Sequence, residues 1–209
     1  MSNGEYNACI LHYIQNNQVL KDGDLVLIDA GCEWQGYASD VTRTFPISGL
    51  FSPEQKQLYQ LVLDAQSAAF EMIKPNNTIK QANDAAIGVI TQGLIDLNIL
   101  YGELADNIER QTYRKFYMHG LSHWLGLDVH DVGDYKIDGQ VRPLRPGMVL
   151  TVEPGIYIAS DADVESKWRG IGIRIEDNLL ITQSGHENLT LAAPKTISDI
   201  EALMLKKRC

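Results

Sequence analysis

The chain has 209 residues, 44% hydrophobic and 22% charged, which is the composition of a folded globular protein rather than a disordered one. Its 18 basic and 27 acidic side chains give a net charge of −9, so we expect neither nucleic acid nor an anionic membrane surface as a partner. No run approaches the roughly 18 apolar residues of a membrane-spanning helix, and the beginning shows no signal-peptide pattern. Three sparse cysteines without metal-type or redox-type spacing indicate a reducing compartment, and we expect a cytoplasmic protein with a single domain over residues 1–209.

The first two predicted elements are the strands of a hairpin. Residues 24–31 form a short apolar run that ends in glycine, which is typical of a buried strand. Residues 36–45 alternate in polarity and become β-branched toward their end, so they are expected to pair antiparallel with the first strand.

Two amphipathic helices are predicted after the hairpin. Ser52, Pro53 and Gln55 form a helix start with a capping box, and Thr78 with Gln81 repeats the capping pattern. We interpret the apolar face of each helix as core rather than as an interaction surface. The apolar residues at helical spacing are Leu58, Leu61, Val62, Ala65, Ala69 and Met72, then Ala82, Ala86, Val89, Ile90, Leu94 and Leu97.

The second half of the chain changes from helices to strands. A third helix is expected over about residues 104–113, and strands are expected at 148–152, 155–158 and 171–181, with glycine and proline between them. Hairpins and capped helices without a regular strand–helix alternation predict an α+β fold.

Asp29 and Asp40 are the first candidate functional residues. If the hairpin turn is centred between Trp34 and Gln35, the two aspartates lie directly opposite each other. If it is centred between Gln35 and Gly36, they are diagonal neighbours. Both registers place the carboxylates on one face, where like charges repel unless a cation lies between them. The alternative is a solvated hairpin face without a function.

Three of the five histidines, His119, His123 and His130, fall in one short segment. Their spacing would place them on one face of a helix, but Gly120 and Gly126 argue against one continuous helix. A single histidine in an apolar setting is usually a hydrogen-bonded core residue. Three of them together indicate a functional site instead.

Two further carboxylates lie in apolar strands. Glu153 follows the apolar residues 149–152, and Glu176 shares one face of its strand with Arg174. A structural ion pair between Glu176 and Arg174 is the alternative to a functional role. Burying an unpaired carboxylate costs roughly several kcal/mol, so Glu153 also needs a partner that its neighbours in the sequence do not supply.

These carboxylates and one histidine together suit a metal site. Four carboxylates and a single imidazole form an oxygen-rich set that fits two divalent ions, Mn²⁺ most naturally, and does not fit a cysteine-based zinc site. Paired ions about 3.5–4 Å apart can hold a bridging hydroxide nucleophile, so the chemistry implied is metal-assisted hydrolysis. The set consists of Asp29, Asp40, one of the histidines, Glu153 and Glu176.

Five ordered segments resemble the pita-bread metallopeptidases, specifically their Xaa-Pro aminopeptidase (aminopeptidase P) and prolidase branch. The segments are residues 27–32, 37–46, 119–131, 146–155 and 170–177, and they span nearly the whole chain. The resemblance implies an α+β fold in which helices cover a curved antiparallel sheet. It also implies a metal-dependent aminopeptidase that hydrolyses the Xaa-Pro bond at a peptide N-terminus, so the expected substrates are peptides with proline at the second position.

The resemblance implies a role for each member of the acidic set and selects the histidine. Asp40 and Glu176 would bridge the two metal ions, His123 and Glu153 would complete one site, and Asp29 would complete the other. The nucleophile would be the metal-bridging hydroxide, and Glu153 would also act as the general base that takes the proton from the bridging water.

The resemblance also implies a substrate pocket around these ligands. His119 and His130 would contact the substrate and stabilise the developing oxyanion, and His12 matches a further pocket histidine. Arg174 and Tyr157 would complete the substrate site by orienting the carboxylates.

The resemblance leaves alternatives open. A prolidase, which cuts only Xaa-Pro dipeptides, is the close alternative, whereas a non-catalytic peptide-binding module would typically lack ligands that are all present here. Residues 128–131 favour the proline-specific branch over methionine aminopeptidases.

Relatives of this branch carry a separate N-terminal domain and an opening helix before the segment around His12. We therefore expect a catalytic domain incomplete at its N-terminus, whose uncovered apolar stripe favours a homo-oligomer.

Overall fold

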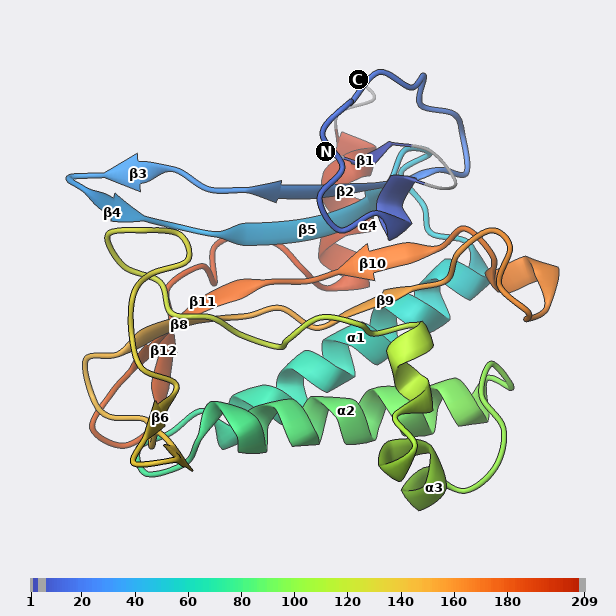
Figure 1. The fold of residues 1–209 in the computed structure, drawn as a ribbon. Coiled ribbons are helices and arrows are strands. Elements are labelled where there is room, and N and C mark those ends of the chain that lie inside the picture. The colour runs from blue at the N-terminus through green and yellow to red at the C-terminus, as the bar shows by residue number, and fades with distance from the viewer. Residues whose placement is uncertain (1, 4–6, 207–209) are drawn as a thin grey trace.

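A curved layer of antiparallel strands lies over two long helices (Figure 1). The computed structural model describes residues 2–3 and 7–206 of the chain. The strands are β1 (Ser2–Asn3), β2 (Leu25–Ala30), β3 (Glu33–Trp34), β4 (Tyr37–Ala38), β5 (Val41–Pro46), β6 (Lys136–Ile137), β7 (Gln140–Val141), β8 (Val149–Val152), β9 (Gly155–Tyr157), β10 (Gly172–Arg174), β11 (Asp177–Ile181) and β12 (His186–Asn188). They pair in the orders β1-β2-β5, β10-β9 and β12-β11-β8, and β3-β4 and β6-β7 are two further hairpins.

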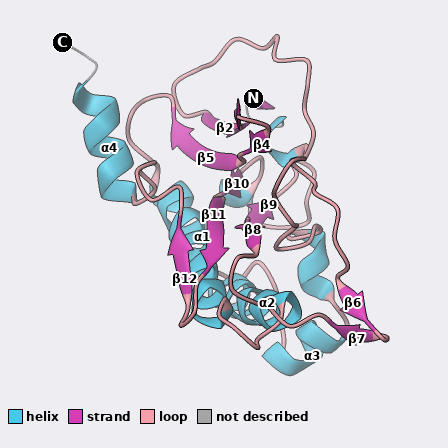
Figure 2. Cartoon of the chain, turned by 90° about the vertical axis from the view of Figure 1, so that its left-hand side faces the viewer, coloured by secondary structure: helices cyan, strands magenta, loops and turns pink. Residues whose placement is uncertain are grey.

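The two long helices run beneath this layer of strands (Figure 1). The helices are α1 (Pro53–Met72), α2 (Ile79–Asp96), α3 (Leu104–Glu109) and α4 (Ile197–Lys206), with the short 3₁₀ helices η1 (Asn7–Cys9), η2 (Thr112–Lys115) and η3 (Ser166–Trp168). The C-terminal helix α4 lies at the opposite end of the molecule from α3 (Figure 2). Within the described part of the chain, none of the helices combines the length and apolar character that crossing a membrane would require.

Both long helices begin as predicted. Ser52 caps α1 and Thr78 caps α2, and each forms a capping box with the side chain of Gln55 or Gln81. The apolar faces of the two helices are buried against each other and against the sheet. Burying one leucine or isoleucine side chain there stabilises the fold by about 1.5–3 kcal/mol. The fully buried members of these faces are Leu58, Val62, Ala65, Ala69, Ala82, Ala86, Ile90 and Leu94.

The hairpin between β2 and β5 adopts one of the two predicted registers. Asp29 pairs with Thr42, which centres the turn between Gln35 and Gly36. Both turn residues have positive φ angles, 52° and 85°, as a two-residue hairpin turn requires if it is to match the twist of the strands. Asp40 is therefore a diagonal neighbour of Asp29 and lies immediately before β5.

The third helix is shorter than predicted. It ends at Glu109, and a 3₁₀ helix covers residues 112–115. Gln111 between them has a left-handed backbone with φ of 54°. A left-handed residue interrupts the hydrogen bonding of a right-handed helix, so the prediction of one helix over residues 104–113 is wrong at its C-terminal end.

The strand predicted over residues 171–181 is two strands. The first part, β10, pairs with β9, and the second part, β11, pairs with β8. Glu176 lies between them, and its backbone N–H donates to the carbonyl of Thr42 on β5 at 3.1 Å. The chain thus changes its pairing partner at one of the predicted site residues.

Candidate metal centre

Asp29 near the end of β2 and Asp40 just before β5 bring two carboxylates together at one end of the hairpin. Both side chains line the same cavity. Burial and the neighbouring Asp40 raise the pKa of Asp29. Burial opposes the charge of Asp40 as well, but hydrogen bonds to His123 and Asp29 hold its pKa below the usual value. The two carboxyl groups therefore favour opposite charge states in the absence of a cation.

His123 lies in an extended segment beside β8 and not in a helix. Its backbone N–H donates to Thr151 Oγ1 at 3.1 Å, and its carbonyl accepts from the N–H of Thr151 at 3.0 Å. The ring Nδ1 donates to the carbonyl of Trp124 at 2.9 Å. The other ring nitrogen, Nε2, faces Asp40 Oδ2 at 3.5 Å and Glu153 Oε1 at 3.6 Å. Burial opposes the charge of His123, but the hydrogen bond to Asp40 raises its pKa when no metal is bound. In the neutral ring, the backbone hydrogen bond selects the tautomer in which Nε2 is free to bind a metal ion.

Glu153 follows the last residue of β8, and its backbone N–H donates to the carbonyl of Leu121 at 2.8 Å. Burial raises the pKa of Glu153 to about 7, although the nearby His123 opposes the shift. Its Oε2 lies 4.0 Å from His119 Nδ1. A carboxyl group with a pKa near neutrality can take up and release a proton at physiological pH.

Glu176 is 1% exposed and accepts a hydrogen bond at Oε2 from the hydroxyl of Thr42 at 2.7 Å. Burial raises its pKa well above the usual value, and the carboxylates of Glu153 and Asp40 raise it further. The site therefore holds more buried carboxyl groups than its positive charges can balance. Bound cations would remove this imbalance.

Three of the five predicted ligands converge closely. Asp40, His123 and Glu176 each present one ligand atom, and these atoms all lie within 4.8 Å of one another. Glu153 borders this group through its contact with His123, and Asp29 lines the same cavity. An oxygen-rich set with one imidazole, in which burial leaves the carboxyl groups short of cations, fits divalent ions.

Arg174 holds Asp29 rather than Glu176. Its Nη2 donates to Asp29 Oδ2 at 2.6 Å and its Nε donates to Thr42 Oγ1 at 3.2 Å. Its Nη1 donates to the hydroxyl oxygen of Tyr157 at 3.1 Å. The structural ion pair between Arg174 and Glu176, which the sequence left open, is not formed. Arg174 orients Asp29 and Tyr157 instead.

His119 makes a different pair of contacts from His123. Its Nδ1 donates to the carbonyl of Gly120 at 2.8 Å, so its Nε2 accepts from the hydroxyl of Tyr157 at 2.8 Å. Burial lowers the pKa of His119 to about 4, which keeps the ring neutral. Tyr157 is 2% exposed and connects His119 to Arg174 from the buried side.

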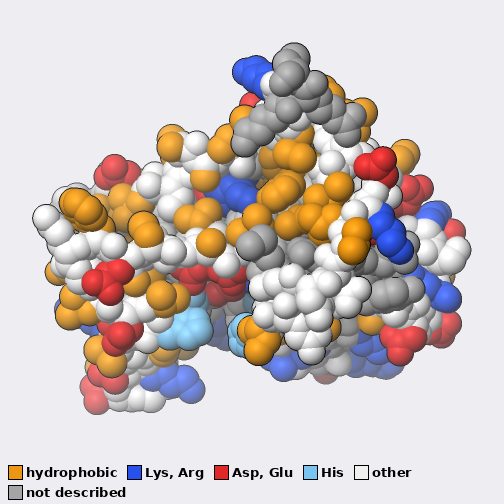
Figure 3. Space-filling model, turned by 90° about the horizontal axis from the view of Figure 1, so that it is seen from above, with side chains coloured by type: hydrophobic (Ala, Val, Ile, Leu, Met, Phe, Trp, Pro, Cys, Tyr) orange, Lys and Arg blue, Asp and Glu red, His pale blue; other side chains and the backbone are white. Residues whose placement is uncertain are grey.

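A cavity of about 280 Å³ brings the predicted site residues together. All of them except Tyr157 line it, including His12 and His130. The ring centroids of His130 and His123 lie 4.4 Å apart. On this face of the molecule, acidic and histidine side chains lie side by side (Figure 3). The lining residues are Leu11, His12, Asp29, Asp40, His119, Gly120, Ser122, His123, His130, Glu153, Arg174 and Glu176.

Sequence reasoning missed two threonines that support the ligands. Thr42 bonds Glu176, and Thr151 bonds the backbone of His123. Thr42 lies two residues from Asp40, so the period-two alternation of a strand places both side chains on the same face. Thr42 is also fully buried, and a buried hydroxyl needs a hydrogen-bond partner. The alternation of side chains along the strand could therefore have predicted Thr42 as a site residue.

Two curated relatives that the chain resembles are Xaa-Pro aminopeptidases. The Xaa-Pro aminopeptidase of Haemophilus influenzae is 62% identical over 201 residues, which is 96% of this chain and 46% of the relative. The Xaa-Pro aminopeptidase of Escherichia coli is 52% identical over 202 residues, which is 97% of this chain and 46% of the relative. The chain therefore spans just under half the length of these curated relatives.

Solved structures match the fold over nearly the whole chain. The structure of Pseudomonas aeruginosa aminopeptidase PepP has a TM-score of 0.95 and 56% identity, covering 96% of this chain and 46% of that one. The zinc-substituted E. coli aminopeptidase P in complex with product has a TM-score of 0.96 and 51% identity, covering 100% of this chain and 47% of that one. These neighbours confirm the predicted pita-bread fold. Residues 2–183 match the model of metallopeptidase family M24, and the chain belongs to that family.

Proposed function

We propose that this chain carries the catalytic site of an Xaa-Pro aminopeptidase, which removes the residue before proline from a peptide N-terminus. The observation that carries the proposal is the convergence of ligand atoms from Asp40, His123 and Glu176 in one cavity. The identity to curated Xaa-Pro aminopeptidases supports this choice of reaction within the family.

The proposed site holds two divalent metal ions, and manganese is the metal that we propose. Asp40 and Glu176 are the proposed bridging ligands, His123 and Glu153 the ligands that complete one site, and Asp29 the ligand that completes the other. Four carboxylates and one imidazole favour a hard or borderline ion of this kind. When bound, such paired ions activate water at neutral pH and polarise the scissile carbonyl.

Glu153 is the proposed general base. Its carboxylate lines the cavity and lies 3.6 Å from His123 Nε2, so it can accept a proton from a water molecule held there. His119 and His130 are the proposed substrate-contacting histidines, and His12 borders the same cavity. Arg174 orients Asp29 directly, and Tyr157 orients His119.

Peptide hydrolysis tests the proposal. With Mn²⁺ added, the chain is expected to cleave Xaa-Pro-Yaa tripeptides and to leave Xaa-Ala-Yaa tripeptides intact. Glu153→Gln should abolish cleavage, whereas Glu187→Gln, at an exposed residue on β12, should leave the rate unchanged. Cleavage of Xaa-Pro dipeptides alone would indicate a prolidase, and metal binding without any cleavage would indicate a peptide-binding module.

A cytoplasmic location and a homo-oligomer are further proposals. Cys9 and Cys32 carry free thiols, as expected of a protein from a reducing compartment. Cell fractionation tests the location. The homo-oligomer rests on the sequence resemblance alone, and size-exclusion chromatography with light scattering tests it.

A further inference from the structure

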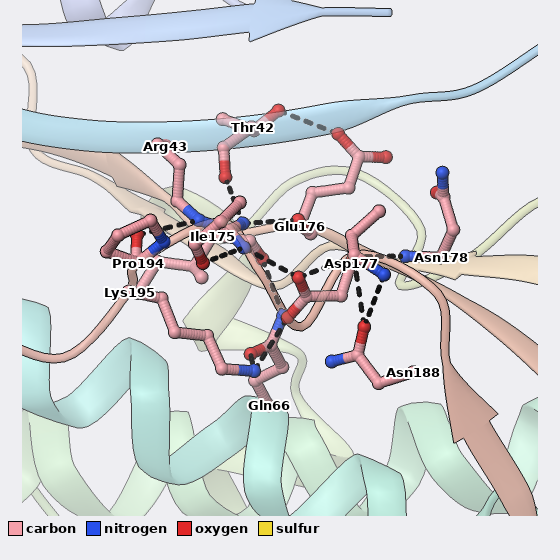
Figure 4. Close-up of polar contacts among 12 residues, drawn as sticks. Thr42, Arg43, Gln66, Ile175, Glu176, Asp177, Asn178, Asn188, Pro194 and Lys195 are labelled. Atoms are coloured by element: carbon pink, nitrogen blue, oxygen red, sulfur yellow. Dashed lines mark hydrogen bonds and ion pairs between the residues drawn. The ribbon is translucent and has the colours of Figure 1, made fainter.

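Asp177, the residue after Glu176, belongs to a second buried charge cluster behind the metal centre. Its side chain is fully buried, and its two oxygens contact two cations. Arg43 Nη2 lies 2.7 Å from Oδ1 and Lys195 Nζ lies 2.6 Å from Oδ2. In Figure 4, Glu176 points toward Thr42 while Asp177 points to the other side of the strand, toward Lys195. The proposed function does not use this cluster.

Arg43 joins three separate parts of the chain through this cluster. Its Nη1 donates to the carbonyl of Glu176 at 2.6 Å, so the guanidinium contacts the backbone of a proposed bridging ligand directly. Its remaining donors anchor it to β5, to β11 and to the segment before α4. The five acceptors are the carbonyl oxygens of Thr42, Glu176, Ala193 and Pro194 and the carboxylate of Asp177.

Lys195 connects the cluster to helix α1. Its Nζ donates to Gln66 Oε1 at 2.7 Å as well as to Asp177, and it lies 4.7 Å from the centre of the Phe70 ring. Its carbonyl accepts from the hydroxyl of Tyr59 at 2.9 Å. The lysine is thus fixed at both ends between α1 and the first residue of β11.

The contacts among Lys195, Asp177 and Arg43 affect the metal centre through Glu176. This residue lies where the chain changes from pairing with β9 to pairing with β8. No regular strand pair holds its backbone there. Its N–H bonds Thr42 on β5, and its carbonyl accepts from Arg43. The backbone position of Glu176 therefore depends on Arg43, whose guanidinium is in turn held by Asp177, while the Thr42 hydroxyl contacts the carboxylate itself.

We propose that Lys195 is a positioning residue that holds Glu176 in place for metal binding, acting through Asp177 and Arg43. The inference rests on the proposed metal centre and adds to it a residue outside the family match, which covers residues 2–183. Groups that orient metal ligands typically change metal affinity by about 10–100-fold when they are removed. An effect of that size is expected for Lys195.

The test compares two lysines of the full chain that both link α1 to the C-terminal part. Lys195→Met keeps the aliphatic stem and removes the cation beside Asp177. Lys56→Met is the matched control, because Lys56 Nζ lies 3.0 Å from Glu201 and touches neither β5 nor β11. Mn²⁺ affinity is measured by calorimetric titration, with thermal unfolding of the metal-free proteins alongside.

The inference predicts that Lys195→Met weakens Mn²⁺ binding by about 10–100-fold, while Lys56→Met stays within about twofold of the wild type. Lys195→Arg, which restores a cation, should recover part of the affinity. Wild-type affinity in Lys195→Met, even with a lowered melting temperature, would overturn the inference and make the cluster merely structural. An equal loss in Lys56→Met would overturn it as well.

Two further results separate this inference from the proposed function. If the wild type binds no Mn²⁺, the proposed metal centre fails and the inference fails with it. If Lys195→Met does not fold, Arg43→Lys supplies the test. It keeps a cation beside Asp177 but removes the guanidinium fork that contacts the Glu176 carbonyl through Nη1 and Asp177 through Nη2. Arg43→Lys is then expected to bind Mn²⁺ about 10–100-fold more weakly, and unchanged affinity would contradict the proposal.

Discussion

His119 and His123 present their ring nitrogens to different partners. The Nδ1 of each donates to a backbone carbonyl, so the free Nε2 decides what each ring can do. In His123 it faces the carboxylates of Asp40 and Glu153, whereas in His119 it accepts from the hydroxyl of Tyr157. Removing the two rings should therefore have different consequences.

We expect His123→Ala to lose bound metal and His119→Ala to retain it. His119→Ala and His130→Ala should instead lower kcat/KM for an Xaa-Pro-Yaa peptide by about 10²–10³-fold, the cost of removing a group that stabilises the transition state. Metal content by elemental analysis and steady-state kinetics measure the two effects. Equal metal loss in all three variants, without a separate kinetic effect, would contradict this division of roles.

At the scale of elements, the hairpin that carries Asp29 and Asp40 depends on a close backbone approach at Gly31. A Cβ atom added there would lie 1.7 Å from the carbonyl oxygen of Ser39, so neither strand can accommodate a side chain without moving. The two carboxylates flank this contact. Their separation is therefore set by a glycine that binds nothing itself.

Gly31→Ala is expected to destabilise the chain and to weaken metal binding together, because it pushes Asp29 and Asp40 apart. Gly88→Ala is the matched control: Gly88 lies within α2, and a Cβ there meets nothing within 4 Å. It should raise the free energy of unfolding by about 0.5–1 kcal/mol and leave metal binding unchanged. Chemical denaturation and metal titration of both variants measure this. Wild-type metal affinity in Gly31→Ala would show that the hairpin does not set the site.

The elements that the sequence predicted well are those with local signals. Capping residues mark the start of both long helices. The hairpin was also predicted, but its sequence allowed two turn positions, and the strand pairing in the structure selects Gln35 and Gly36. The division of β10 from β11 is not a local event, because it reflects a change of partner strand. Likewise β12 and α4 were not predicted, since their places depend on strands and helices far away in the sequence.

In the candidate site, too, local signals were predictable from the sequence and long-range contacts were not. Carboxylates within apolar strands and clustered histidines pointed to the cavity-lining residues. Burying such groups costs free energy unless they are paired, so their presence in apolar segments indicates a site. The partner of Arg174 could not be read from strand alternation. Alternation suggested Glu176, whereas the fold brings Asp29 to it from a strand 145 residues earlier. The cluster around Asp177 escaped prediction for the same reason.

For the molecule as a whole, the buried carboxyl groups link stability to pH. Burial raises the pKa of Glu153 from 4.5 to about 7 and that of Glu176 well above its usual value. A carboxyl group with a raised pKa in the folded state contributes stability below its unfolded pKa, and this contribution is lost as the pH rises through the folded pKa. A bound cation replaces the proton and should restore the lost stability.

We therefore expect the stabilisation by Mn²⁺ to grow as the pH rises from about 4.5 to about 7, the range between the unfolded and folded pKa values of Glu153. Melting temperatures with and without Mn²⁺, measured across this range, give the increment directly. Binding near pH 6 should also release protons to the buffer, which calorimetry in two buffers detects. An increment that is constant or falls with pH would contradict the account.

The number of metal ions bound per folded chain decides whether the five proposed ligands form a two-metal site. Titration of the metal-free wild type with Mn²⁺, followed by calorimetry and elemental analysis, should reach two ions per chain. Asp40→Asn should bind fewer than two ions tightly, because it removes a proposed bridge, whereas Asp29→Asn should spare the ion at His123. Saturation of the wild type at a single ion, or two tightly bound ions in Asp40→Asn, would contradict the five-ligand site.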